Sequence, residues 1–179
     1  MAPCKTRRIP GLALTLTIVA GLGAVTWSAP MLTVPKKSLS DEILTLAGIT
    51  EVKLIISRLP DRLTDAGYTA ELIYKNWTED LKKEGIAVVD DDAVPMLRLS
   101  VATSTDESAP DTICFLNFVT IEHSTFVDRL DRKFHIPTWT GLKLALTNED
   151  TLGKRFSERL KDSLNHLILR IGEASANPK

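Results

Sequence analysis

The stretch TNEDTLGKRFSERLKDSLNHLILRIG, residues 147–172, predicts the longest helix of this chain and guides the interpretation of the rest. Its apolar residues recur at spacings of three and four, which gathers them along one side of an α-helix. The letters TNED match a capping-box pattern at a helix start. A helix with one apolar side needs a sheet or another helix to cover it. The apolar stripe consists of Leu152, Phe156, Leu160, Leu164, Leu167, Ile168 and Ile171.

A second helix is predicted over residues 68–86, YTAELIYKNWTEDLKKEGI. Thr69 is placed to cap its first turn, and Gly85 suits the left-handed position that ends a helix. A shorter helix is expected in SLSDEILTLAG, residues 38–48, with Ser38 or Ser40 as its cap. The residues expected on the buried arc of the second helix are Ala70, Ile73, Tyr74, Trp77 and Leu81.

Five segments have the composition of β-strands: residues 51–57, 86–89, 96–103, 112–126 and 134–147. Apolar and polar residues alternate in several of them, so one face of the sheet meets water and the sheet is partly antiparallel. The first half of 112–126 is apolar on both faces, which predicts a central strand. In the last segment, Pro137 indicates an edge or a break, and the pattern between Trp139 and Leu142 predicts a bulge at Gly141. Trp139 is expected in the core.

The element order is strand, helix, four strands, helix. It predicts an α+β fold: a two-layer sandwich with a mostly antiparallel sheet of four to five strands and two main helices on one face. We expect a signal peptide or membrane anchor over residues 1–29 and a linker with a short helix over 30–49. A single domain is expected over 50–174, with a frayed tail over 175–179.

The composition is that of an ordinary globular protein, with 44% hydrophobic and 25% charged residues among 179 and a formal net charge of −1. Removing residues 1–29 takes away Lys5, Arg7 and Arg8 and no acid, so 19 basic residues remain against 23 acidic ones. A mildly acidic domain does not attract nucleic acid or an anionic membrane surface. We therefore expect no nucleic-acid partner, and membrane contact only through residues 9–29.

Residues 9–29, IPGLALTLTIVAGLGAVTWSA, follow the basic stretch KTRR and have the pattern of a targeting segment. Cleavage after Ser28 would leave Thr26 three residues before the new end. An uncleaved anchor is the alternative, because these 21 residues at ~1.5 Å each can cross a hydrocarbon core of ~30 Å. Either reading places residues 30–179 outside the cytoplasm, in the periplasm or secreted, or tethered to the inner membrane.

From residue 50 onward the pattern resembles a loose group of small exported bacterial proteins with no assigned activity. The matching features are LTDAGYTAEL, a charged helix ending in LKKEGI, the strand LRLSV, the motif PTWTG and a long amphipathic helix before the terminal NPK. The layout is also similar to that of the outer-membrane lipopolysaccharide-assembly lipoprotein, which has two helices on an antiparallel sheet. That protein carries a lipid-bearing cysteine after its apolar run, whereas Cys4 here precedes it. The resemblance transfers no functional residue.

No group of residues in the sequence predicts catalysis, a cofactor or a metal site. His123 and His135 could meet across adjacent strands near Glu122, but Glu122 points to the opposite face from His123. The acidic run at residues 90–92 lacks the alternating ligands and the glycine of a calcium loop and is interpreted as a solvated turn. Cys114 lies in the apolar run TICFLNF and is expected to be buried.

The sequence therefore favours a non-catalytic exported accessory or interaction protein of the cell envelope, with an envelope protein as its partner. The alternatives are a small extracytoplasmic hydrolase and a carrier of an apolar ligand. A pocket with converging polar groups would favour the hydrolase. A dry apolar slot would favour the carrier. An exposed edge strand or apolar patch would favour the interaction protein.

Overall fold

The computed structural model describes residues 39–176. The predicted leader and most of the predicted linker lie outside these residues, so both stay predictions. The elements in chain order are α2 (Asp41–Leu44), β1 (Glu51–Ile56), α3 (Asp61–Asp65), α4 (Ala70–Lys83), β2 (Ala87–Val88), β3 (Met96–Asp106), β4 (Ala109–Val127), the 3₁₀ turn η1 (Asp128–Leu130), β5 (Arg132–Thr147) and α5 (Glu149–Ala176).

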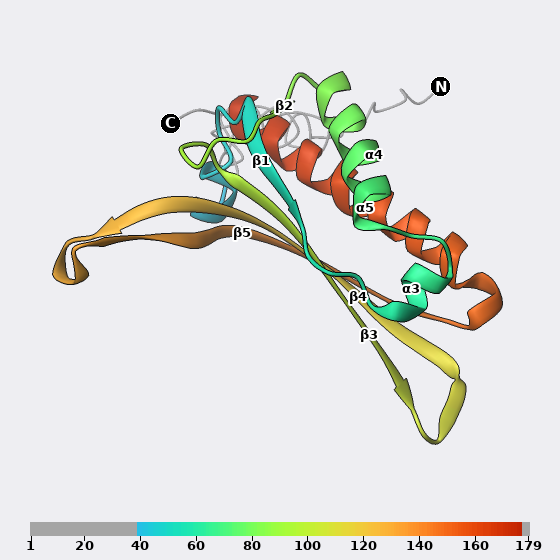
Figure 1. Cartoon of the computed structure of the whole chain (residues 1–179). Helices are drawn as coiled ribbons and strands as arrows, with labels where there is room; N and C mark the ends of the chain where they lie inside the picture. Colours follow the sequence, from blue (N-terminus) through green and yellow to red (C-terminus); the bar gives the residue numbers. More distant parts are fainter. Residues whose placement is uncertain (1–38, 177–179) are drawn as a thin grey trace, which may run out of the picture. The chain divides into compact units, whose positions relative to one another are not determined.

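The five strands form one sheet in the order β2-β1-β3-β4-β5. Strand β1 pairs in parallel with β2 and β3, whereas the longer β3–β4 and β4–β5 pairings are antiparallel. The parallel part follows from α4, because a helical crossover joins β1 to β2. The predicted central strand, β4, lies between β3 and β5. The β3–β4 and β4–β5 hairpins extend beyond the helices at opposite ends of the sheet and bend away from them (Figure 1).

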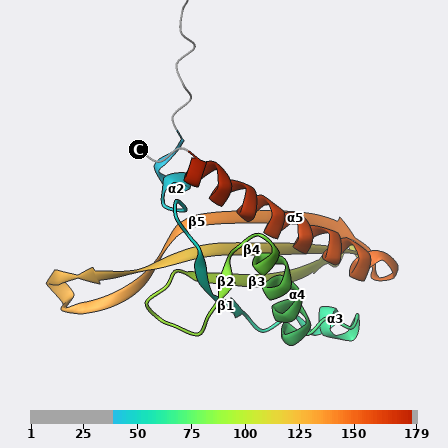
Figure 2. The same cartoon turned by 90° about the horizontal axis from the view of Figure 1, so that it is seen from above.

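Both long helices cover the same face of this sheet, as the α+β two-layer prediction expected (Figure 2). Helix α4 packs on β1 and β2, and α5 packs on β4 and β5. The predicted cap of α4 is confirmed, because Thr69 Oγ1 accepts from the Leu72 N–H at 3.1 Å. At the start of α5 the cap lies one residue after Thr147 of the TNED capping-box pattern: Asn148 Oδ1 accepts from the Thr151 N–H at 3.1 Å. Gly85 ends α4 at a φ of +79°. We call the face under these helices the covered face and the opposite one the uncovered face.

The core fills the space between the covered face and the helices. Phe156 of α5 contacts Phe115 of β4 edge to face, with ring centroids 5.8 Å apart, and Tyr68 on its other side at 4.9 Å. Trp139 is buried, as expected. The largest fully buried side chains are Phe115, Phe156, Leu46, Leu63, Leu81, Leu97, Leu99, Ile113, Ile121, Leu152, Leu164 and Leu167.

Three details differ from the sequence prediction. Tyr74 is exposed, because the buried side of α4 narrows to Ile73, Trp77 and Leu81. Helix α3 was not predicted, since five residues are too few to show a helical period. The bulge lies at Thr138, where Ile121 pairs with Trp139 but Glu122 pairs with Pro137.

Gly141 has a different role from the predicted bulge. It lies two residues after Trp139 on the covered face, and a Cβ built on it would stand 2.6 Å from Cη2 of the indole ring. The missing side chain therefore lets the Trp139 ring lie flat over the strand. Since the strand is regular from residue 139 onward, Leu142 points to the face opposite Trp139.

Candidate functional site

The uncovered face carries a cluster of apolar side chains on β4 and β5. Each pair consists of directly opposite residues, Cys114 with Leu146, Leu116 with Leu144, and Phe118 with Leu142. The three leucines of β5 are 56%, 57% and 63% exposed at positions 142, 144 and 146, and Phe118 is 38% exposed. We call these six residues the outer-face patch. Singly exposed apolar residues are normal, but a contiguous group marks an interaction site more often than chance.

Cys114 lies within this patch, and the prediction that it is buried was wrong. It is a free cysteine with partial exposure, opposite Ser104 on one side and Leu146 on the other. Its neighbours Ile113 and Phe115 point to the covered face and are fully buried. The sequence showed apolar residues on both faces of β4, and the second apolar face remains uncovered by any described element.

A polar cluster borders the patch on the same face. Arg98 Nε donates to Glu122 Oε1 at 2.9 Å, and Thr120 Oγ1 donates to the same oxygen at 3.2 Å. Thr120 and Glu122 are both buried, although they lie on the face that has no helix. The division of the uncovered face thus runs along β4: residues 114–118 belong to the apolar patch with β5, and Thr120 and Glu122 belong to the polar cluster with Arg98 of β3.

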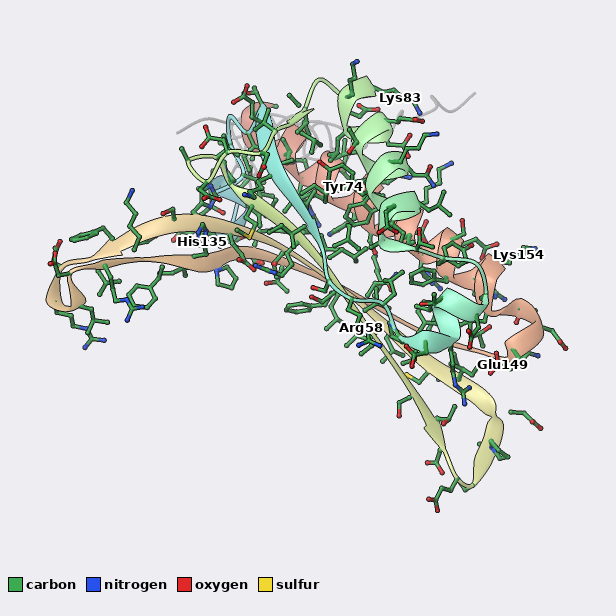
Figure 3. The ribbon with its side chains drawn as sticks, in the orientation of Figure 1. Arg58, Tyr74, Lys83, His135, Glu149 and Lys154 are labelled. Carbon is green, nitrogen blue, oxygen red and sulfur yellow. The ribbon has the colours of Figure 1, made fainter. Side chains whose placement is uncertain are left out.

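The histidines do not assemble into a metal or catalytic site. His123 pairs with Ile136 and His135 pairs with Ser124, so the two imidazoles lie on opposite faces of the hairpin. His135 lies on the extended β4–β5 arm, away from the helices (Figure 3). Glu122 is bound to Arg98. Within residues 39–176, no three histidine, cysteine or acidic side chains come close enough to hold a metal ion.

His123 and His166 have lowered pKa values. Burial lowers the pKa of His123, whose Nδ1 lies 2.8 Å from Thr138 Oγ1. Burial also lowers the pKa of His166, and the positive charges of Lys143 and Arg170 lower it further. His166 lies beside Trp139, with ring centroids 6.0 Å apart. A lowered pKa favours the neutral imidazole in both histidines, and His166 of α5 packs in this form beside Trp139.

The acidic run at residues 90–92 is an anchoring turn for β1. Lys53 Nζ lies 2.7 Å from Asp90 Oδ1 and 2.8 Å from Asp92 Oδ1. These contacts raise the pKa of Lys53, and the hydrogen bond from Lys53 lowers the pKa of Asp92. The Asp91 carboxylate accepts from the Ala93 N–H at 2.8 Å and so closes the turn. The carboxylates thus have partners within the protein, in line with a solvated turn.

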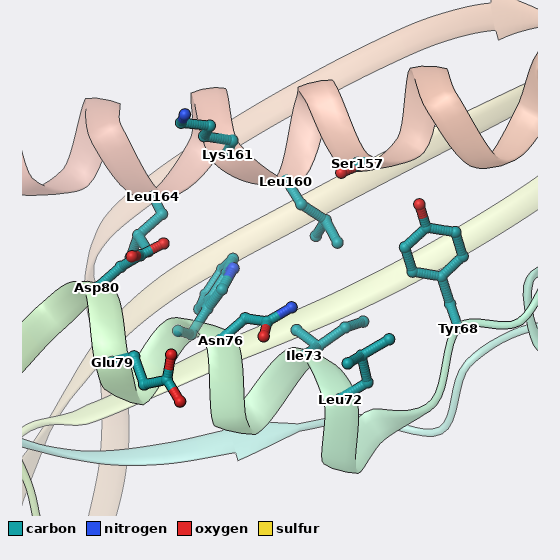
Figure 4. A pocket seen from close by; sticks show the side chains of 11 residues that line it. Tyr68, Leu72, Ile73, Asn76, Glu79, Asp80, Ser157, Leu160, Lys161 and Leu164 are labelled. Atoms are coloured by element: carbon teal, nitrogen blue, oxygen red, sulfur yellow. The ribbon is translucent and has the colours of Figure 1, made fainter.

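A groove runs between α4 and α5 (Figure 4). Its volume is about 280 Å³, and its floor includes the buried side chains of Trp77 and Leu164. Polar groups line its rim, but Asp80 is held by Lys83 at 2.6 Å and the Tyr68 hydroxyl donates to the Gly153 carbonyl at 2.8 Å. The residues that line the groove are Tyr68, Leu72, Ile73, Asn76, Trp77, Glu79, Asp80, Ser157, Leu160, Lys161 and Leu164.

The groove does not hold the arrangement of a serine hydrolase. A serine nucleophile needs a base within hydrogen-bond reach and a third group that orients that base. Ser157 is the one serine among the lining residues, and no histidine lines the groove with it. The groove is also at the lower size limit of small-molecule sites. The outer-face patch is therefore the stronger candidate for a functional surface.

Comparisons with solved structures find distant neighbours, among them three bacterial lipoproteins. No protein-family model and no curated protein matches the sequence. A minor lipoprotein from Acinetobacter baumannii is similar at 16% identity and a TM-score of 0.35, over 73% of this chain and 94% of that one. Rare lipoprotein B from Shewanella oneidensis is 20% identical at a TM-score of 0.28, over 70% and 93%. An uncharacterized lipoprotein B from Nitrosomonas europaea is 13% identical at a TM-score of 0.27, over 70% of this chain and 81% of that one.

All three neighbours are lipoproteins by name. In the part of the chain from residue 39 to residue 176, no helix has the length and apolar character needed to cross a membrane.

Proposed function

We propose that this chain is a non-catalytic interaction protein of the cell envelope that binds a partner protein through the outer-face patch. The observation that carries the proposal is the pairing of six apolar side chains on a face that no described element covers. The basic start and apolar run at residues 5–29 support export. The groove between α4 and α5 has no histidine beside Ser157, whereas a serine hydrolase needs such a base.

The energetics of the patch suit partner binding. Leu142, Leu144 and Leu146 are each more than half exposed, and removing that area from water is worth roughly 1 kcal/mol per leucine. The backbone under them is already ordered by pairing with β4, so binding does not require folding of a flexible segment. The Arg98–Glu122 pair at the border supplies a polar rim, as protein interfaces have around an apolar centre.

Site-specific photo-crosslinking in the cells that produce the protein tests this proposal. A benzophenone amino acid is placed at Leu116 or Phe118, both on the patch but away from the sheet edge. The matched control is Tyr74, which is exposed on α4 at 43%, close to the 38% of Phe118. We expect one discrete envelope-protein adduct from the two patch positions and none from Tyr74. Equal adducts from all three positions, or none from the patch, would contradict the proposal.

A substitution in the patch provides the second arm of the test. Phe118→Ser should abolish the adduct formed from position 116, because it places a hydroxyl in the centre of the apolar contact. It should leave the melting temperature within a few degrees of the original, since Phe118 is outside the core. An adduct that survives this change would mean that the contact does not depend on the patch.

A further inference from the structure

The free edge of β5 is blocked by α2 over only part of its length. The Thr140 N–H points away from β4 and donates to Glu42 Oε1 at 3.1 Å. Thr45 Oγ1 lies 3.4 Å from the Thr138 carbonyl oxygen, while its hydroxyl donates to the Glu42 carbonyl at 2.7 Å. These two side chains of α2 and its C-cap occupy the edge at residues 138–140. Strand β5 continues to Thr147, so the seven residues Gly141–Thr147 follow the blocked part.

In this remaining stretch, the backbone N–H and C=O groups of every second residue point outward, away from β4. Backbone directions alternate along a strand, and β5 pairs with β4 without interruption from residue 139 to residue 147. Because the Thr140 N–H points outward, the N–H and C=O groups of Leu142, Leu144 and Leu146 do so as well. No described residue caps these groups as α2 caps Thr140. The same three residues carry exposed leucine side chains, and an open apolar edge is a template for strand pairing.

The pattern of this edge is complementary to itself. Leu144 is the middle residue of Gly141–Thr147, with Leu142 and Leu146 placed evenly on either side. A two-fold axis through Leu144 would set Leu142 opposite Leu146 of a second copy, so that leucines meet leucines on one face. On the other face, Lys143 would lie opposite Ala145 of the second copy. Like charges are therefore not placed directly opposite each other.

We propose that two copies of this chain pair antiparallel along Gly141–Thr147 of β5, with Leu144 on the two-fold axis. The result is one continuous sheet with five strands from each copy. The inference goes beyond the proposed function, because it concerns the edge of the sheet and leaves the uncovered face open. It places the two outer-face patches side by side, and α2 keeps this pairing from extending past residue 140.

Disulfide trapping tests the register directly. The full chain is prepared with Cys4→Ser and Cys114→Ser, and single cysteines are introduced at the edge. Directly opposite residues of an antiparallel pair have Cα atoms about 5.5 Å apart, within disulfide reach. Leu144→Cys should therefore crosslink with itself under mild oxidation. Leu142→Cys should not, since the two copies of position 142 lie about 13 Å apart along the strands.

A mixture provides the matched control for this register. Leu142→Cys combined with Leu146→Cys should give a mixed dimer, whereas neither variant alone should crosslink. Crosslinking of Leu142→Cys alone with the same yield as Leu144→Cys would overturn the proposed axis. A chain that sediments as a monomer at every concentration reached would overturn the pairing itself.

A blocking variant completes the experiment. Leu144→Pro removes an outward N–H that β4 does not use, and edge positions tolerate proline. We expect the mass measured by sedimentation to fall from that of a dimer to that of a monomer, while the far-UV circular dichroism spectrum stays unchanged. If Leu144→Pro fails to fold, Leu144→Lys tests the same point by placing two like charges on the axis. A dimer that persists in the folded variant would overturn the proposal, whereas Phe118→Ser should leave the dimer intact.

Discussion

On the covered face of β4 and β5, Phe115 and Ile113 are fully buried beneath α5, whereas Leu142 and Leu144 on the opposite face are more than half exposed. Both faces carry apolar side chains at alternate positions, and only one has helices on it. The covered face therefore stabilises the fold, and its counterpart is available for binding. The difference teaches that apolar character alone does not assign a residue to the core. Whether a strand residue is buried depends on whether a helix covers its face of the sheet.

The same leucine-to-alanine change should have very different effects on the two faces. Leu164 of α5 is 2% exposed, and Leu146 of β5 is 63% exposed. Leu164→Ala should lower the free energy of unfolding by ~2–5 kcal/mol through the lost burial and the cavity. Leu146→Ala should change it by less than ~0.5 kcal/mol. Urea unfolding at low protein concentration measures both, and equal losses would mean that the two faces are not distinct.

The comparison of two glycines sharpens the account of the covered face. Gly141→Ala would bring a Cβ to 2.6 Å from the Trp139 ring, and the forced shift should cost ~1–3 kcal/mol of stability. Gly153→Ala in α5 meets Tyr68 at an ordinary 3.5 Å. Gly153→Ala should raise the free energy of unfolding by ~0.5–1 kcal/mol, because alanine has a higher helix propensity than glycine. Thermal melts give the signs, and a stabilising Gly141→Ala would mean that the indole does not lie there.

Local pattern was enough to predict most elements of this fold but not the assignment of its faces. Helix caps and strand alternation act over a few residues, so Thr69, Gly85 and the strands were predicted correctly. In LKLAL, leucine would ordinarily point inward and lysine outward. The pairing of Trp139 with Ile121 reverses this, since it fixes the register and turns the leucines out. Lys143 lies on the covered face at the outermost strand, where its ammonium can reach past the edge to water.

The one fully buried amide of the covered face offers a test with a gain in stability. Asn117 is completely buried, and neither Nδ2 nor Oδ1 has a hydrogen-bond partner among the described residues. An unpaired buried polar group costs ~1–3 kcal/mol. Asn117→Leu keeps the number and branching of the side-chain heavy atoms, and the loss of the unpaired polar groups should raise the free energy of unfolding by ~1 kcal/mol. A clear loss in chemical denaturation would mean that the amide has a structural partner.

The smallest expected effect is a dependence of stability on pH near neutrality. The pKa values of His123 and His166 are lowered by burial in the folded protein, whereas histidine in the unfolded chain titrates near ~6.5. Their neutral forms contribute stability above this value, and that contribution is lost as the pH falls through ~6.5 and below. The melting temperature should drop from about pH 7.5 to about pH 6. The double variant His123→Gln, His166→Gln should show a smaller drop in melting temperature. An identical drop would mean that other titratable groups cause the pH dependence.

The accessibility of Cys114 in the cell tests the central claim most directly, because this natural thiol lies within the outer-face patch. In the full chain with Cys4→Ser, its labelling by a membrane-impermeant maleimide is compared between the intact envelope and the purified protein. Tyr74→Cys, in a chain that also carries Cys114→Ser, is the control on α4. Docking of a partner on the patch predicts that Cys114 labels readily in the purified protein and several-fold more slowly in the envelope, while position 74 labels equally in both. Equal labelling of Cys114 in the two settings would contradict the account.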